Sequence, residues 1–180
     1  MRTLLSETRL RDGVEDMANK INDRYGSEPL TIVAVMTGSL VLLADLIRQL
    51  RMPIRVSLIQ ASSYRGGTKS GDLYIRDDMM LDVSQRNVLV LDDIFDTGKT
   101  LQAILGCVSQ MNPASLASAV LLHKEARQIV DIVPDYVAFK IPDEFVVGYG
   151  LDYQDLFRNL PYLAVLETED LKAMENEVSA

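Results

Sequence analysis

Residues 87–100 read NVLVLDDIFDTGKT, and this stretch decides the fold of the chain. The apolar run 88–91 has the length and composition of a strand that is buried on both faces of a parallel sheet. It ends at two adjacent carboxylates, Asp92 and Asp93, and a helical pattern begins at Leu101. A strand that leads through a short turn into a helix is the repeating unit of α/β sheets.

The turn after this strand has the chemistry of a site for a ligand with hydroxyl and phosphate groups. Ionised carboxylates only accept hydrogen bonds, so Asp92 and Asp93 suit the paired hydroxyls of a ribose. Both lie at the carboxyl end of a strand, where open α/β sheets bind their ligands. Gly98 lets the backbone approach a ligand closely. The free N–H groups of the next helix attract a phosphate, and Thr97 and Thr100 add hydroxyl donors.

Two other interpretations of this segment are less favourable. Gly98, Lys99 and Thr100 match the end of the Walker A motif, but that motif requires glycine at position 93. Asp93 stands there and would face the phosphates with a negative charge, which excludes an ATP-binding P-loop. An acidic turn that only caps a strand–helix unit does not need three aspartates within five residues, of which Asp96 is the third.

Strand and helix patterns alternate along the chain and predict a doubly wound parallel sheet. Apolar runs predict strands over residues 31–36, 54–61, 88–91, 116–122 and 136–140. Helical spacing predicts helices over 10–25, 40–50, 101–111 and 124–130. The polar segment 62–82, with a hairpin around residues 73–75, is interpreted as a lid, and the acidic residues after Glu167 as a frayed end.

Length, composition and charge limit the class of protein. The 180 residues predict a single domain, 1–180, with a sizeable core. A net charge of −8 argues against a general nucleic-acid surface. Neither a membrane span nor a signal peptide is evident. The single cysteine, Cys107, is expected in the core, and a cytoplasmic location is expected because it cannot form an internal disulfide.

Three segments together resemble a known family. Residues 87–100 resemble the phosphoribosyl-pyrophosphate signature of the type I phosphoribosyltransferases, and the ending DTGKT is similar to the hypoxanthine-guanine branch. Residues 141–158, IPDEFVVGYGLDYQDLFR, resemble its purine-binding stretch, and residues 61–64, ASSY, the start of its mobile loop. The resemblance implies the type I phosphoribosyltransferase fold, an α/β fold with a small hood built from the chain ends that covers the base.

The resemblance implies a purine salvage enzyme. Such an enzyme moves the 5-phosphoribosyl group of phosphoribosyl pyrophosphate to N9 of hypoxanthine, and of guanine, and releases pyrophosphate. Mg²⁺ is the implied cofactor, with Asp92, Asp93 and Asp152 as metal-site residues, the first two through the ribose hydroxyls. Asp92 replaces the more common glutamate and has a shorter reach. The implied partners are the sugar pyrophosphate and a 6-oxopurine, without nucleic acid or membrane, in a homodimer or homotetramer.

Base-side roles also follow from the resemblance. Asp96 matches the aspartate that handles the proton near purine N7, although it could instead only cap the phosphate turn. Lys124 matches the lysine that donates to the 6-oxo group, where position alone favours a solvated lysine. Phe145 would stack on the purine and Val146 would contact it through the backbone, whereas the pattern alone makes Phe145 a core residue. Asp152 matches a residue near the purine, with a helix N-cap as the alternative.

Pyrophosphate-side roles follow in the same way. Arg158 matches the pyrophosphate-binding arginine, whose fork suits phosphate oxygens, with a surface arginine as the alternative. Thr37 and Gly38 match the pyrophosphate loop, which is often associated with a cis peptide. Many relatives have Lys or Arg in place of Thr37, so contacts there would come from the backbone. Ser63 and Tyr64 would belong to a lid that excludes water.

The sequence also bears on other base specificities and on one other class of protein. The stretches around Lys124 and Phe145 argue against adenine, whereas xanthine differs at a position read mostly by backbone and stays open. A regulator that keeps the fold as a nucleotide sensor and binds RNA or DNA would need a basic face or an added domain, and the chain is acidic. His123 is expected at a strand end with its side chain pointing away from the site.

Overall fold

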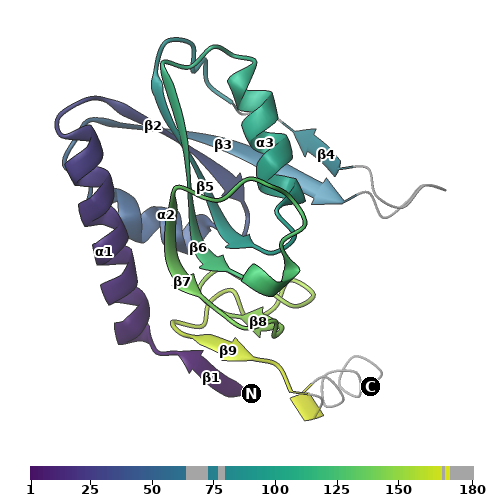
Figure 1. Cartoon of the computed structure of the whole chain (residues 1–180). Coiled ribbons are helices and arrows are strands. Elements are labelled where there is room, and N and C mark those ends of the chain that lie inside the picture. The colour runs from purple at the N-terminus through teal and green to yellow at the C-terminus, as the bar shows by residue number, and fades with distance from the viewer. Residues whose placement is uncertain (64–72, 77–79, 168, 171–180) are drawn as a thin grey trace.

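The fold is built around a six-stranded central sheet. The computed structural model describes residues 1–63, 73–76, 80–167 and 169–170. The strand order is β4-β3-β2-β5-β6-β7 (Figure 1). The strands are β2 (Leu30–Met36), β3 (Ile54–Ser63), β4 (Leu73–Arg76), β5 (Asn87–Phe95), β6 (Ser115–His123) and β7 (Tyr136–Lys140). Only the β3–β4 pair is antiparallel, so the predicted doubly wound parallel sheet is confirmed, with one antiparallel edge strand.

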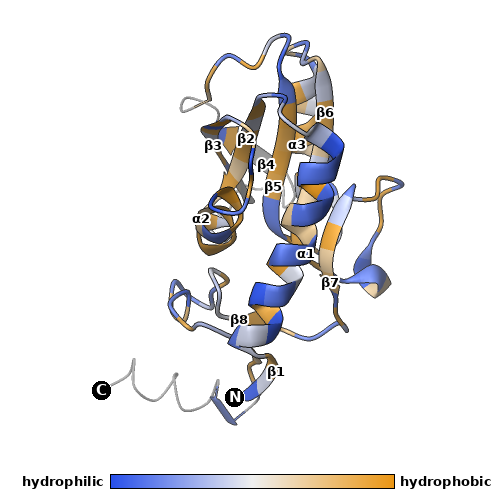
Figure 2. Ribbon diagram, turned by 90° about the vertical axis from the view of Figure 1, so that its left-hand side faces the viewer, coloured by the Kyte–Doolittle hydropathy of each residue, from blue (hydrophilic) through white to orange (hydrophobic). Residues whose placement is uncertain are grey.

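Helices cover both faces of this sheet. The helices α1 (Glu7–Tyr25) and α2 (Leu40–Ile47) pack on one face, and α3 (Lys99–Ser109) packs on the other (Figure 1). On β2, Ile32 and Ala34 pack toward α1 and α2, whereas Val33 and Val35 pack toward α3. Successive side chains of a strand point to opposite faces, and both faces are covered here. The central strands β2 and β5 accordingly show largely hydrophobic colouring in Figure 2.

One predicted helix is wrong. The sequence pattern favours a helix over residues 124–130, but only a single 3₁₀ turn forms there, η1 (Glu125–Arg127). The Gln128 side-chain amide donates to the carbonyls of Val130 and Ile132. The Ile129 N–H donates to the Thr97 carbonyl. These bonds satisfy backbone groups outside a helix, so the chain leaves the turn in an extended conformation. The helix predicted over 40–50 ends three residues early, at Ile47.

A second, smaller sheet forms the hood. It consists of β1 (Arg2–Leu5), β9 (Leu163–Val165) and β8 (Val146–Val147), in that order and with antiparallel pairing. The N-terminal ammonium pairs with the Asp170 carboxylate at 2.7 Å. The two ends of the described chain therefore meet at this small sheet.

Three smaller expectations have different outcomes. The hairpin expected around residues 73–75 is present as the β3–β4 pair. Most of the lid segment 62–82, and the chain end after Asp170, lie outside the described residues. Cys107 was expected in the core, but it is only half-buried.

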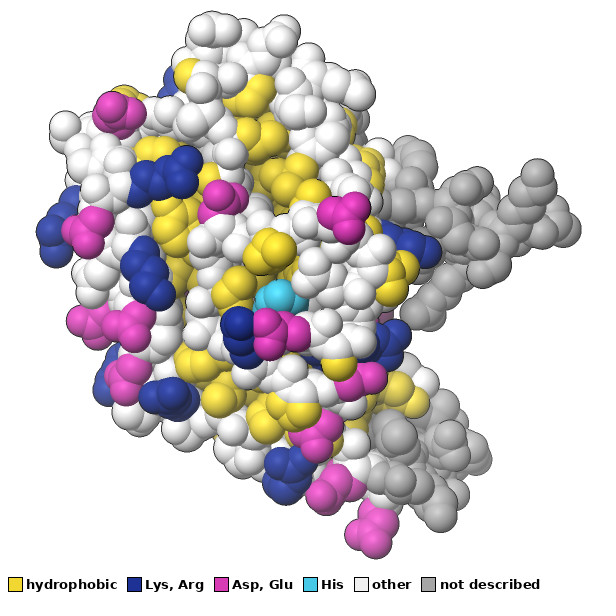
Figure 3. All heavy atoms as spheres, viewed as in Figure 1, with side chains coloured by type: hydrophobic (Ala, Val, Ile, Leu, Met, Phe, Trp, Pro, Cys, Tyr) yellow, Lys and Arg dark blue, Asp and Glu magenta, His cyan; other side chains and the backbone are white. Residues whose placement is uncertain are grey.

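The surface carries mixed charge. On the face shown in Figure 3, acidic and basic side chains are interspersed with apolar ones. Among the described helices, none has the length and hydropathy that crossing a membrane requires.

Candidate active site

The predicted site residues gather where the strand order reverses. The chain passes from β2 through α2 to β3 on one side, and from β5 through α3 to β6 on the other. The loops after β2 and β5 therefore separate, and α/β sheets bind ligands in the crevice at such a point. Two adjoining cavities open there.

The first cavity, called the turn cavity, has a volume of about 500 Å³. Most of the residues predicted from the phosphate signature and the pyrophosphate loop line it. These are Thr37, Gly38, Asp92, Asp93, Asp96, Thr97, Gly98 and Thr100. Two predicted residues of the segment 141–158, Asp152 and Arg158, also line this cavity. The second, called the hood cavity, has a volume of about 410 Å³. The predicted site residues that line the hood cavity are Asp93, Asp96, Lys124, Phe145, Val146 and Asp152.

Asp92, which is buried, and Asp93, which is half-buried, form an acidic pair at the end of β5. The Asp93 N–H donates to Asp92 Oδ1 at 3.0 Å. Burial, and then the neighbouring charge of Asp93, raise the pKa of Asp92 well above its ordinary value of 3.8. Burial also raises the pKa of Asp93, although the positive charge of Arg158 opposes that rise. Two carboxylates held this close together are stabilised by any ligand that brings hydroxyl donors or a cation.

Glycines allow three chain segments to touch beside this pair. A Cβ atom on Gly38 would lie 1.6 Å from Asp93 Oδ2, which no real contact permits. A Cβ atom on Gly150, in the hood loop, would lie 2.2 Å from the Gly38 carbonyl oxygen. Gly150 also has a φ of +101°, which favours glycine. The peptide between Met36 and Thr37 is cis.

The turn after the acidic pair is shaped for an anion. Gly98 is the N-cap of α3 and has a φ of +86°, and a Cβ there would meet Phe95 at 2.6 Å. Thr97 and Thr100 line the turn cavity. The Lys99 side chain is exposed and lies outside the described lining of the turn cavity, so its backbone N–H is the group placed to contribute.

The solvent exposure of Lys124 and of Phe145 differs from what their positions in the sequence alone would favour. The Lys124 side chain is only 8% exposed, and its Nζ lies 3.8 Å from Asp143 Oδ1, so it is not a solvated lysine. Phe145 is 53% exposed, so the core assignment is wrong. Its ring meets Tyr153 edge-to-face at 5.7 Å between centroids. Val146 is buried behind it.

Asp152 and Arg158 form an ion pair that borders both cavities. Arg158 Nη2 lies 2.8 Å from Asp152 Oδ1, and Nη1 donates to the Gly150 carbonyl at 2.8 Å. Asp152 Oδ2 accepts the Asp155 N–H at 2.9 Å. Asp152 thus caps a turn rather than the helix that the alternative required. The Arg158 side chain is fixed by an ion pair and a hydrogen bond, so it is not the free surface arginine of the alternative.

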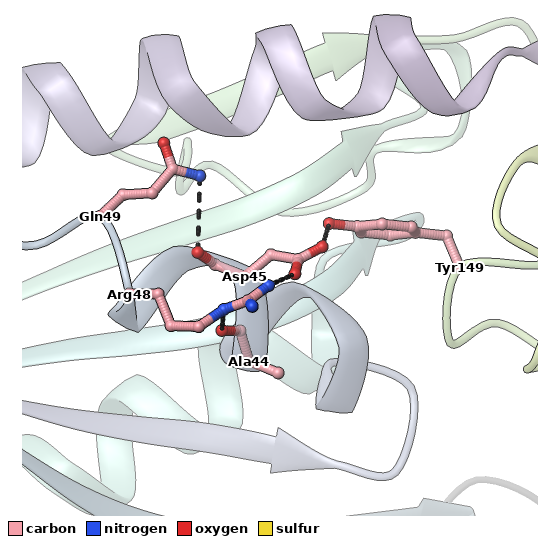
Figure 4. A network of polar contacts seen from close by, with 5 residues as sticks. All are labelled: Ala44, Asp45, Arg48, Gln49 and Tyr149. Carbon is pink, nitrogen blue, oxygen red and sulfur yellow. Dashed lines mark hydrogen bonds and ion pairs between the residues drawn. The ribbon is translucent and has the colours of Figure 1, made fainter.

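A polar network that sequence reasoning missed fixes the hood loop to the core. The Tyr149 hydroxyl donates to Asp45 Oδ2 of α2 at 2.6 Å, and the other Asp45 oxygen pairs with Arg48 (Figure 4). Burial and the hydrogen bond to Asp45 raise the pKa of Tyr149 far above its ordinary value. Gly150 follows Tyr149 directly and packs against Gly38. The network therefore helps to fix the position at which the hood loop, which also carries Arg158, contacts the loop after β2.

Two residues beside the hood cavity also bear on the sequence interpretation. Arg127 was not singled out, yet it lines the cavity, with Nε 2.8 Å from Asp96 Oδ1. Its spacing of three residues from Lys124 was an available signal, because side chains three apart in a 3₁₀ turn lie on the same side. His123 ends β6 as expected and is buried edge-on against Phe95.

The lid residues and the metal remain predictions. Ser63 is the last residue of β3, with an undescribed side chain, and Tyr64 lies outside the described residues. The described part of the chain contains no cluster of three or more potential ligand side chains that could hold a metal by themselves. Asp92, Asp93 and Asp152 nevertheless offer carboxylate oxygens to the turn cavity, which is the donor type that Mg²⁺ prefers.

The acidic pair makes the pH dependence of stability predictable. Because burial raises the pKa of Asp92, the folded protein holds a proton that the unfolded chain loses above pH 3.8. The free energy of unfolding should therefore fall as pH rises from 3.8 through the folded-state pKa. Asp92→Asn should remove much of this fall and stabilise the ligand-free protein at pH 7.

Thermal unfolding between pH 4 and pH 8 checks this prediction. The Asp92→Asn variant should show a higher Tm than the wild type at pH 7, and the difference should shrink toward pH 4. Asp131→Asn, at an exposed aspartate, is the matched control and should follow the wild type. An Asp92→Asn variant that is less stable than the wild type at pH 7 would contradict the account.

Comparisons with known proteins agree with this geometry. Residues 2–154 match the family model of the phosphoribosyl transferase domain. The hypoxanthine-guanine phosphoribosyltransferase of Staphylococcus epidermidis is 41% identical over 167 residues, which cover 92% of this chain and 93% of the relative. The enzyme of the same name from Staphylococcus aureus is 38% identical over the same length.

Solved structures give the same result. A crystal structure of a Bacillus anthracis hypoxanthine-guanine phosphoribosyltransferase superimposes with a TM-score of 0.88 and 37% identity, covering 93% of this chain and 99% of that one. A Trypanosoma cruzi hypoxanthine phosphoribosyltransferase superimposes with a TM-score of 0.90 and 34% identity, covering 98% and 96%. Sequence, fold and site geometry thus converge, and the chain belongs to the phosphoribosyltransferase family.

Proposed function

We propose that this protein is a purine salvage enzyme that transfers the 5-phosphoribosyl group of phosphoribosyl pyrophosphate to N9 of hypoxanthine or guanine. The observation that carries the proposal is the pair of adjoining cavities that share Asp93, Asp96 and Asp152. One cavity has an acidic pair and an anion-accepting turn. The other has a buried lysine and an exposed aromatic ring. Two relatives named hypoxanthine-guanine phosphoribosyltransferase match nearly the whole chain, and they support this assignment.

The turn cavity takes the sugar pyrophosphate. The ribose hydroxyls donate to Asp92 and Asp93, and the 5-phosphate rests on Thr97, Thr100 and the free N–H groups that open α3. When the bond between C1 and the pyrophosphate oxygen breaks, positive charge develops on the sugar, as in glycosyl transfer generally. The acidic pair lies in the same cavity and favours that charge.

The hood cavity takes the base. The Lys124 ammonium can only donate, so it suits the 6-oxo oxygen of hypoxanthine or guanine. Phe145 offers an exposed ring face for stacking, and Val146 offers its backbone. The C1–N9 bond forms as pyrophosphate leaves, and the base must give up a proton. Asp96 accepts this proton, a role supported by its position at the border of both cavities.

The leaving pyrophosphate is held between the hood loop and the loop after β2. Arg158 supplies a fork for phosphate oxygens, and Thr37 and Gly38 supply backbone groups. Mg²⁺ would be held by Asp152, and by Asp92 and Asp93 through the ribose hydroxyls. When bound, it neutralises pyrophosphate charge. Few protein ligands are needed, because Mg²⁺ keeps waters and substrate phosphates in its shell.

Two finer features complete the proposal. Adenine is disfavoured, because its 6-amino group would leave the Lys124 ammonium unpaired, whereas xanthine remains an alternative substrate. We also place the protein in the cytoplasm as a homodimer or homotetramer, which the family resemblance supports.

Titration calorimetry with the product nucleotides tests the base assignment. IMP and GMP fill both cavities, and AMP should bind about 10- to 100-fold more weakly, because a buried charged donor loses its partner. Lys124→Met should remove this preference, since the donor is gone. Lys140→Met, which removes an exposed cation outside the described linings of the two cavities, should leave it intact. Equal affinity of the wild type for AMP and IMP would contradict the role of Lys124.

A further inference from the structure

Arg127 contacts two carboxylates beside the hood cavity. Its Nε lies 2.8 Å from Asp96 Oδ1, and its Nη1 lies 3.5 Å from Asp143 Oδ1. The same Asp143 oxygen lies 3.8 Å from Lys124 Nζ. The row Asp96–Arg127–Asp143–Lys124 therefore alternates in charge along the base-binding side of the site. Its two outer members are the groups assigned to the base.

The surroundings of Asp96 show what Arg127 does. The Asp96 side chain is 37% exposed, yet its Oδ1 atom is shielded from solvent and accepts no hydrogen bond from the described residues. The 2.8 Å contact with Arg127 is thus the interaction that compensates this oxygen. A shielded carboxylate oxygen without a partner is costly. The exposed remainder of the side chain borders the two cavities.

We propose that Arg127 is a positioning residue for the reaction. This inference rests on the proposed function. The guanidinium holds Oδ1 of Asp96 and so keeps the rest of the carboxylate turned toward the base, where it meets the proton. The same guanidinium also contacts Asp143, which is the charge partner of Lys124. Arg127 thus sets the carboxylate and the ammonium at a fixed separation across the purine.

The experiment compares single and double variants by steady-state kinetics of nucleotide formation from hypoxanthine. Arg127→Met keeps an unbranched, largely apolar stem and removes the charged guanidinium. It should lower kcat about 10- to 100-fold, as expected for coupling between residues in contact. The KM for phosphoribosyl pyrophosphate should stay within about twofold, because Arg127 lies outside the described lining of the turn cavity. Arg127→Lys should recover part of the loss, because it restores a cation.

Lys140→Met is the matched control. Lys140 pairs with Glu125 of the same 3₁₀ turn at 2.6 Å, and both side chains are largely exposed. Removing this cation should change kcat by less than about twofold, as expected for an exposed pair. The control separates loss of a nearby ion pair from loss of the contact with Asp96.

The decisive readout is the double variant Asp96→Asn/Arg127→Met. If Arg127 acts through Asp96, adding Arg127→Met to Asp96→Asn should lower kcat by less than about threefold further. Full additivity, or an Arg127→Met variant that matches Lys140→Met, would overturn the inference and leave the proposed function intact. A wild type that converts no base at all would overturn the proposed function, and this inference with it.

Discussion

The Gly38→Ala variant is expected to lose at least about 100-fold in kcat/KM for phosphoribosyl pyrophosphate, equivalent to about 2.7 kcal/mol of transition-state stabilisation. A Cβ atom on Gly38 would lie 1.6 Å from Asp93 Oδ2, so the loop or the carboxylate must move. Gly150 packs against the Gly38 carbonyl from the other side, which restricts movement of the loop. The displacement therefore falls on the acidic pair that we propose holds the ribose.

Gly106→Ala is the matched control for this substitution. Gly106 lies within α3, and a Cβ atom there would have nothing within 4 Å. Alanine at that position should leave activity unchanged and stabilise the helix by up to about 1 kcal/mol. Steady-state kinetics, with circular dichroism to monitor folding, would measure both effects. A folded Gly38→Ala variant with wild-type kcat/KM would contradict the placement of Asp93 against the loop.

The second large effect is expected from Asp96→Asn. The amide keeps the size of the carboxyl group but cannot take the proton that the base gives up. The kcat for nucleotide formation should therefore fall by about 10²- to 10⁴-fold, the range found for general acid–base groups. Binding of phosphoribosyl pyrophosphate, measured by titration calorimetry with Mg²⁺, should change little. A carboxylate that only capped the phosphate turn would show the opposite pattern, with weaker binding of the sugar pyrophosphate and a largely preserved kcat.

Much of the fold could be predicted because the strands that carry it are buried on both faces. The runs 31–36 and 88–91 are apolar without alternation, and the structure covers each face with helices. The short segment after Lys124 gave no such signal. Its conformation is set by the hydrogen bonds of one side chain, Gln128, and local helical spacing was misleading there.

The site was predictable where its residues are adjacent in sequence and less so where they meet through the fold. Asp92 and Asp93 could be found from their position after a strand. The contact between Tyr149 and Asp45 joins residues 104 positions apart, and no local pattern predicts it. The exposure of Phe145 likewise depends on where the hood places it, since a Phe before two valines has the composition of a core strand.

One assay tests the central claim most directly: pyrophosphate release from phosphoribosyl pyrophosphate and Mg²⁺, with hypoxanthine, guanine, xanthine, adenine and uracil offered separately. The account predicts turnover of hypoxanthine or guanine. Adenine should stay inert because its 6-amino group leaves the Lys124 ammonium without an acceptor, and uracil should stay inert because it lacks the imidazole ring that carries N9. Binding of the sugar pyrophosphate without turnover of any base would contradict it.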